Sequence, residues 1–277
     1  MTTERPEARR TAARRRVNHM MPAIIVAVVL VAAWQLYVMI SGIRPQVLPS
    51  PARVLHQGWA HRTDIAGHAV ATLQVTIVGF AVSLTLAWVL AISVDFSPWL
   101  RRAFVPLFVA SQTVPIVAIA PLMIIWFGFG LLPKILVIAL ATFFPMAIGL
   151  IEGFAAADRE AGALLRSMGA TRWQVFRYVR LPSALPRFFT SLRIGITYAV
   201  VGAVFAEYVG ATSGLGIYMA MQKNSFRTDL VLAAVLVTAA VSLVLYLLTY
   251  VAERIVAPWA LTTENRAAEN RTAGSRA

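Results

Sequence analysis

The sequence predicts an all-α protein that crosses a membrane about six times, and three observations predict this class. Hydrophobic residues make up 59% of the 277 residues and charged residues only 13%, about half the charged share of a soluble domain. The apolar residues fall in separate runs of about 20, the helix length that crosses about 30 Å of hydrocarbon. The alternating ten-residue segments of a membrane β-barrel are absent from the sequence.

Six runs are predicted to be membrane spans: Met21–Ile40, Ala69–Val94, Ala103–Phe127, Ile135–Phe154, Phe188–Ala206 and Leu230–Ala252. The first is interpreted as a retained span, because it is too long for a signal peptide and lacks a small-residue cleavage site. The predicted organisation is a basic tail without regular structure over residues 1–20, a first membrane helix over 21–41, an outer segment over 42–66, the main membrane domain over 67–254 and a polar tail over 255–277.

The positions of the positive charges predict the orientation of the chain and argue against a nucleic-acid partner. The net charge is +13. If both termini face the cytoplasm, about three quarters of the Lys and Arg residues lie in inner segments, as the positive-inside rule expects. A nucleic-acid binder would display these charges on a soluble domain, so the expected surroundings are the lipid bilayer of the cell membrane.

No metal or cofactor is expected from the residue types. The chain has no cysteine, which excludes disulfides and thiolate ligands. His56, His61 and His68 lie near one another, but a metal site needs tighter spacing and more ligands.

Two proline-containing segments predict local structure. Ser50 is expected to cap a short amphipathic helix that begins at Pro51 and lies on the outer surface. The predicted third span contains Pro106, Pro115 and Pro121, which are expected to bend it by freeing backbone carbonyls. Such a bend is either structural or a gating hinge.

A polar stretch, DREAGALLRSMGATRWQVFRYVRLP at 158–182, lies between the fourth and fifth predicted spans. Its first half places apolar residues on one helical face: Ala161, Leu164, Leu165 and Met168. Gly169 is expected to end that helix, and Thr171 to cap a second one. The second helix has an apolar face of its own, formed by Val175, Phe176 and Val179, and is expected to end at Leu181-Pro182. By pattern alone the stretch is either an amphipathic segment on the inner leaflet or a docking element for another protein.

The stretch resembles the cytoplasmic loop of the permease subunits of binding-protein-dependent ABC importers, which carries the signature E-A-A-x3-G-x9-I-x-L-P. Gly169 matches the central glycine and Leu181-Pro182 the final pair, with Val179 in place of isoleucine. The match departs at Ala163, where the family has glutamate; the nearest acid is Glu160, one turn earlier. The segments VLPSPARV, TVPIVAIAPLMIIWFGFG and AEYVGATSGLGIYM extend the resemblance over most of residues 45–254. It is closest to permeases for nitrate, sulfonate, taurine and thiamine-pyrimidine-type solutes.

This resemblance implies a type-1 ABC permease core over residues 67–254 and a coupling helix that inserts into a groove on a cytoplasmic ATPase. The implied coupling loop comprises Glu160, Ala161, Ala163, Leu164, Met168, Gly169, Ala170, Phe176, Leu181 and Pro182. The implied partners are two ATPase subunits, an extracytoplasmic solute-binding protein and a second copy of the chain. No G-x4-G-K-[ST] motif occurs in the sequence, so ATP hydrolysis is expected in a separate subunit and the chain itself is not expected to be an enzyme.

Polar residues and a proline within or beside the spans are the candidate lining of the translocation path or its gate: Gln112, Thr113, Pro115, Thr142, Tyr198 and Glu207. Each polar side chain either lines the path or hydrogen-bonds a neighbouring helix. Glu207, beside the GATSGLG loop, is interpreted as a solvated carboxylate at the interface, with the mouth of the path or a cation site as alternatives. The expected substrate is a small polar solute of open identity. A channel or ion-coupled carrier is the main alternative, disfavoured because no acid lies in mid-span.

Overall fold

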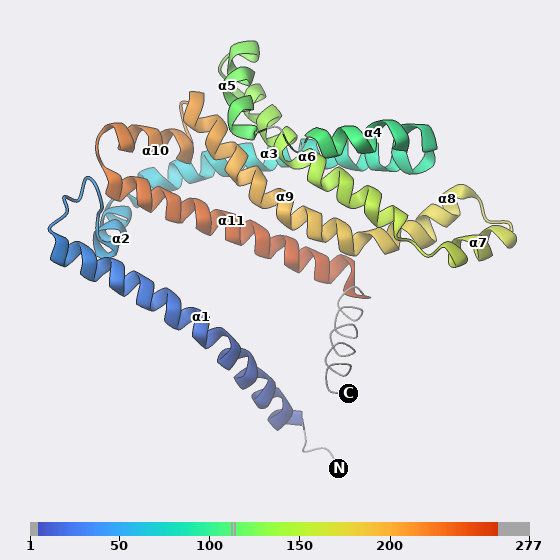
Figure 1. Ribbon diagram of the computed structural model, residues 1–277, viewed down its shortest axis with the longest axis horizontal. Coiled ribbons are helices and arrows are strands. Elements are labelled where there is room, and N and C mark those ends of the chain that lie inside the picture. Colours follow the sequence, from blue (N-terminus) through green and yellow to red (C-terminus); the bar gives the residue numbers. More distant parts are fainter. Residues whose placement is uncertain (1–4, 112, 114, 260–277) are drawn as a thin grey trace. The chain divides into compact units, whose positions relative to one another are not determined.

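The computed structural model describes residues 5–111, 113 and 115–259, and every regular element in this part of the chain is a helix. This confirms the predicted all-α class. The elements in chain order are α1 (Arg5–Ser41), α2 (Pro51–Ala60), α3 (Arg62–Phe96), α4 (Pro98–Ser111), α5 (Ile116–Phe127), α6 (Leu131–Ala155), α7 (Arg159–Ser167), α8 (Arg172–Val175), the π-helical turn η1 (Phe176–Arg180), α9 (Leu181–Gly210), α10 (Leu215–Asn224) and α11 (Thr228–Val256) (Figure 1).

Within the described residues, five helical segments are long and apolar enough to cross a membrane: Met21–Ser41, Arg62–Phe96, Leu131–Ala155, Arg172–Gly210 and Thr228–Val256. They contain the first, second, fourth, fifth and sixth predicted spans. A shorter apolar helix, Ala118–Phe127, covers the second half of the third predicted span. The prediction of about six spans is therefore consistent with the structure. The third span differs from the others because two shorter helices, α4 and α5, form it.

The third predicted span is not one helix: α4 ends at Ser111 and α5 begins at Ile116. Pro115 has extended backbone angles, with φ −69° and ψ 118°, and it has no N–H to donate to the carbonyl of Ser111, four residues earlier. Hydroxyl groups satisfy carbonyls freed at the break: Ser111 Oγ donates to Phe108 O over 2.8 Å, and Thr113 Oγ1 donates to Ala110 O over 2.7 Å. The proline at the break, rather than those inside α4 and α5, ends the helix.

The N-terminal tail also differs from the prediction, because α1 begins at Arg5. The prediction of a tail without regular structure is therefore wrong for residues 5–20, while residues 1–4 lie outside the described residues. Alanine and arginine, which dominate this segment, favour helix. Pro6 falls in the first turn, where its missing N–H has no intrahelical partner to lose.

The chain forms two compact units, and the first comprises Met1–Arg62 and Met221–Ala233. Its charged centre is Asp229, whose side chain is only 4% exposed and accepts from Arg53 Nε over 3.1 Å and Arg227 Nε over 3.3 Å. Arg227 also donates to Gln57 Oε1 over 3.0 Å. Ser50 caps α2 as predicted, with Arg53 N donating to its Oγ over 3.3 Å. These bonds hold α2 against the first turn of α11.

The second unit comprises Thr63–Ala220 and Ala234–Ala277, and its centre is the packing of α6 against α9, which run side by side (Figure 1). Its apolar core is drawn from both helices and includes Met146, Leu150, Phe154, Phe188, Phe189 and Leu192. Small residues let the two backbones approach closely. A Cβ atom added at Gly153 would lie 2.9 Å from Ala184 Cα, closer than van der Waals contact allows.

We expect Gly153→Ala to destabilise the protein, because the added methyl meets helix backbone that cannot rotate away. Overpacking of this kind costs about 1–3 kcal/mol. The matched control is Gly67→Ala in α3, where nothing lies within 4 Å of the added atom and the gain in helix propensity is about 0.5–1 kcal/mol. Thermal unfolding in detergent distinguishes the two variants. Equal stability of both would contradict close α6–α9 packing at Gly153.

Candidate functional site

Residues Asp158–Pro182, here called the coupling element, form a helical hairpin at one end of α6 and α9 (Figure 1). The hairpin begins where Asp158 caps α7, with Oδ1 accepting from Glu160 N over 2.8 Å and from Ala161 N over 3.3 Å. An N-cap carboxylate satisfies amides that have no partner within the helix and interacts favourably with the helix dipole. The first helix of the element is therefore fixed by its own sequence.

The turn between α7 and α8 is built as the sequence predicts. Gly169 has φ +84°, a left-handed conformation that favours glycine. Its N–H donates to Arg166 O over 3.0 Å, and Ala170 N donates to Leu165 O over 3.0 Å, the bond pattern of a Schellman motif. Thr171 then caps α8 in a reciprocal pair with Gln174. Hydrogen bonds on both sides of Gly169 make the turn well defined.

The predicted helix end at Leu181-Pro182 is wrong. Leu181 N donates to Phe176 O, a bond to the fifth preceding residue, so helical structure continues from Arg172 to Gly210. The wider π turn precedes Pro182 and lets its ring fit into the first turn of α9. Ser183 Oγ also donates to Val179 O over 2.7 Å. The second half of the coupling element, from Arg172 onward, therefore shares one continuous helical path with α9.

Aromatic packing and one ion pair anchor the coupling element to α3 and α6. Phe176 is 3% exposed, and its ring centroid lies 5.4 Å from that of Phe96 and 5.2 Å from that of Phe154. Arg180 Nη1 lies 2.7 Å from both carboxylate oxygens of Asp95. Asp95 has a side chain only 7% exposed, so the pair stabilises a charge that would be costly to bury alone.

The predicted coupling residues divide into an exposed and an anchoring set. Leu164 and Met168 are 63% and 76% exposed; Glu160, Ala163 and Gly169 are also exposed. Ala161, Ala170, Leu181 and Pro182 are half-buried, whereas Phe176 belongs to the core and presents nothing to a partner. The exposed apolar side chains of the predicted set, Leu164 and Met168, therefore lie in the second half of α7 and at its C-cap.

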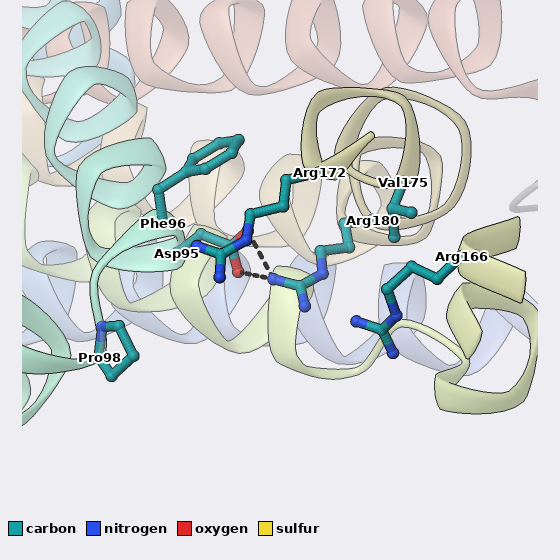
Figure 2. A pocket seen from close by; sticks show the side chains of 7 residues that line it. All are labelled: Asp95, Phe96, Pro98, Arg166, Arg172, Val175 and Arg180. Carbon is teal, nitrogen blue, oxygen red and sulfur yellow. Dashed lines mark hydrogen bonds and ion pairs between the residues drawn. The ribbon is translucent and has the colours of Figure 1, made fainter. Parts of the chain in front are cut away.

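The coupling element and one end of α3, the end predicted to face the cytoplasm, together line two adjoining cavities. One is about 250 Å³ and is lined by Asp95, Phe96, Pro98, Arg166, Arg172, Val175 and Arg180 (Figure 2). The other is about 340 Å³ and adds, among others, Arg101, Asp158 and Arg159. Arginine dominates the polar lining of both.

The predicted path residues lie on separate elements and differ in exposure. Thr142 is fully buried, and its Oγ1 lies 2.7 Å from Ser83 Oγ and 2.9 Å from Ile138 O, so it joins α6 to α3. Tyr198 on α9 is 48% exposed, and Thr113 and Pro115 are exposed at the break between α4 and α5. The prediction for Gln112 falls outside the described residues.

Glu207 is not a solvated carboxylate, because its exposure is 0%. Its Oε2 accepts from Thr72 Oγ1 over 2.8 Å and from Gly216 N over 3.0 Å, while Leu215 N donates to Thr72 Oγ1 over 2.8 Å. A Cβ atom added at Gly214 would lie 2.1 Å from the Glu207 carboxyl carbon. The glycines of the GATSGLG loop therefore make room for the carboxylate, which ties the loop to α3.

Two acids outside the predicted set of site residues, Asp95 and Glu253, lie in ion pairs. Asp95 begins the short loop DFSPWLRR, and Glu253 lies at the end of the last apolar run. Glu253 Oε2 lies 3.3 Å from Arg193 Nη1, with side chains 7% and 18% exposed, and joins α11 to α9. An isolated acid at the end of an apolar run predicts such an ion pair, since a charge at that position needs a partner.

Comparison with known proteins agrees with this architecture. Residues 83–261 match the family model described as the inner membrane component of binding-protein-dependent transport systems. The riboflavin transport system permease protein RibX of Chloroflexus aurantiacus is 37% identical over 237 residues, covering 85% of this chain and 88% of RibX. The formylaminopyrimidine transport permease protein ThiX of Halalkalibacterium halodurans is 32% identical over 235 residues, covering 83% of this chain and 92% of ThiX.

A solved structure shares the fold. The crystal structure of an amino acid ABC transporter with histidines superposes with a TM-score of 0.60 at 15% identity, covering 71% of this chain and 96% of that chain. The family match, the relatives and the apolar helices agree on a multi-pass inner membrane protein that serves transport. The chain belongs to the family of inner membrane components of binding-protein-dependent transport systems, the permease subunits of ABC importers.

Proposed function

We propose that a separate ATPase binds the coupling element and drives this permease subunit. Movement then passes from the coupling element through α8 and η1 into α9. The observation that carries the proposal is the uninterrupted helical path from Arg172 to Gly210. A continuous helix transmits displacement along its axis, because each turn is hydrogen-bonded to the next. Movement of α8 therefore reaches the part of α9 that carries Tyr198 and ends beside Glu207.

In this proposal the ATPase docks on the exposed apolar side chains of α7 and its C-cap residue. Leu164 and Met168 are 63% and 76% exposed, and burying such side chains against a partner contributes about 1.5–3 kcal/mol each. Ala163 has no carboxylate with which to bind the ATPase, so the contact rests on these apolar side chains and on the fixed Gly169 turn. Glu160, exposed in the first turn of α7, is the acid placed to substitute for the missing glutamate.

The proposed assembly contains two copies of the permease, two ATPase subunits and an extracytoplasmic solute-binding protein. Residues 67–254 form the permease domain, and both termini face the cytoplasm. The charge bias of the sequence supports this orientation, because it places the arginine-rich coupling element on the inner side. A single chain supplies only half of a translocation path, which supports a homodimer.

The proposed substrate is a small polar solute of the nitrogen-heterocycle class. RibX and ThiX are named for the transport of riboflavin and formylaminopyrimidine, and both names denote planar, hydrogen-bonding ring systems. The spans of this chain have few charges, which supports a solute that needs no strongly charged internal site. Riboflavin and formylaminopyrimidine are therefore the first probes for uptake.

We expect Gly169→Val to uncouple transport from ATP hydrolysis. A side chain at φ +84° costs about 1–2 kcal/mol, which shifts the turn away from its native form by on the order of tenfold. Uptake of riboflavin or formylaminopyrimidine into vesicles should fall by a similar factor, with basal ATPase activity retained. Gly169→Asn is the matched control, because asparagine tolerates left-handed angles. Unchanged uptake in the valine variant would exclude Gly169 as a coupling turn.

We expect Met168→Glu and Leu164→Glu to weaken ATPase binding without unfolding the permease, because both side chains are exposed. Loss of about 1.5–3 kcal/mol of apolar burial corresponds to about a tenfold or greater loss of affinity. Co-purification of the ATPase, titrated against its concentration, measures this loss. Tyr178→Glu is the control, since Tyr178 is 67% exposed in η1 but lies off the α7 face. Equal effects of all three variants would contradict docking through α7.

A further inference from the structure

The cavity between the coupling element and the end of α3 has an excess of positive charge. Its lining includes three arginines, Arg166 from α7, Arg172 from α8 and Arg180 from η1, against a single acid, Asp95. Figure 2 shows these arginine side chains lying in a row and extending from their elements toward the Asp95 side of the cavity. At a volume of about 250 Å³ the cavity is slightly smaller than typical pockets for drug-sized ligands.

Asp95, the acid in the lining of this cavity, already forms an ion pair. Arg180 Nη1 contacts both oxygens of Asp95 at 2.7 Å. Within the described part of the chain, Arg166 and Arg172 have no ion-pair partner. Both are exposed residues; guanidinium groups that line one cavity repel one another, and an anion between them relieves a repulsion that solvent only weakens. The adjoining cavity adds Arg101 and Arg159 against one further acid, Asp158, so the excess of positive charge extends into it.

We propose that the cavity is a binding site for a phosphate group, held by Arg166 and Arg172 and placed beside the Asp95–Arg180 pair. The guanidinium fork binds phosphate oxygens through paired, charge-assisted hydrogen bonds. A phosphate group, whether free or in a phospholipid diester, presents several charged oxygens that can contact both unpaired arginines at once, whereas a halide ion offers a single point of contact. The small volume fits a phosphate group better than a large organic anion.

A phosphate at this position would connect the two helices of the coupling element across the Gly169 turn. Arg166 lies before the turn and Arg172 after it, so one anion that contacts both holds α7 to α8. The group comes either from free phosphate in the cytoplasm or from an anionic phospholipid headgroup of the inner leaflet. The site therefore makes the stiffness of the coupling element depend on anion binding.

Isothermal titration calorimetry of the purified full-length permease with inorganic phosphate, at constant ionic strength, tests the proposal. We expect saturable binding that Arg166→Gln and Arg172→Gln each weaken by about tenfold, the effect of one lost charged hydrogen-bonding partner. Arg177→Gln removes one positive charge from the same element, at an exposed residue outside both cavities, and should leave the affinity unchanged. An unchanged melting temperature confirms that the variants are folded.

The source of the phosphate is distinguished in nanodiscs. Weaker phosphate binding in phosphatidylglycerol than in phosphatidylcholine nanodiscs assigns the site to a lipid headgroup, whereas equal binding assigns it to free phosphate. Absence of saturable binding to the wild-type chain, or an equal loss in Arg177→Gln, would overturn the proposal. The titration contains no ATPase, so its outcome is independent of whether the coupling element docks on one.

Discussion

The continuous helical path from Arg172 to Gly210, which joins α8 to α9, is the constraint on which the rest of the proposed function depends. A proline normally ends such a path, because it lacks an N–H and crowds the preceding turn. Here the bond from Leu181 N to Phe176 O widens the helix just before Pro182, and the helix continues to Gly210. The family's Leu-Pro pair thus occurs within a helical path that joins the coupling element to the membrane span.

Contacts of buried charges fix the ends of this path. At the predicted cytoplasmic end, Arg180 pairs with Asp95 of α3; further along, Arg193 pairs with Glu253 of α11. At the far end Glu207 accepts hydrogen bonds from Thr72 and Gly216. Removing one partner of either ion pair leaves an uncompensated charge, which costs several kcal/mol, and removing a donor to Glu207 leaves a buried carboxyl oxygen without a hydrogen bond. Each contact therefore fixes which neighbouring helix moves with α9.

The fold class and the local structure of the coupling element could be predicted from the sequence, because both depend on short-range signals. Apolar runs of helix length, the capping residue Thr171 and the left-handed glycine Gly169 each act within a few residues of the chain. The break at Pro115 and the continuation through Pro182 could not be distinguished in advance. The same residue type stands at a helix end in one place and is accommodated in the other, where the preceding turn widens into a π turn. The burial of Glu207 likewise depends on Thr72, which is distant in sequence.

The central claim, that α8, η1 and α9 move as one body, can be tested by a distance measurement within one chain. The sequence contains no cysteine, so spin labels can be attached specifically at Tyr178→Cys in η1 and Ile194→Cys in α9, both exposed positions. One copy in the assembled transporter carries both labels, and pulsed electron paramagnetic resonance compares the nucleotide-free and ATP-bound states. The account predicts the same intramolecular distance distribution in both states. A distribution that shifts on ATP binding would show that η1 moves relative to α9 and would contradict it.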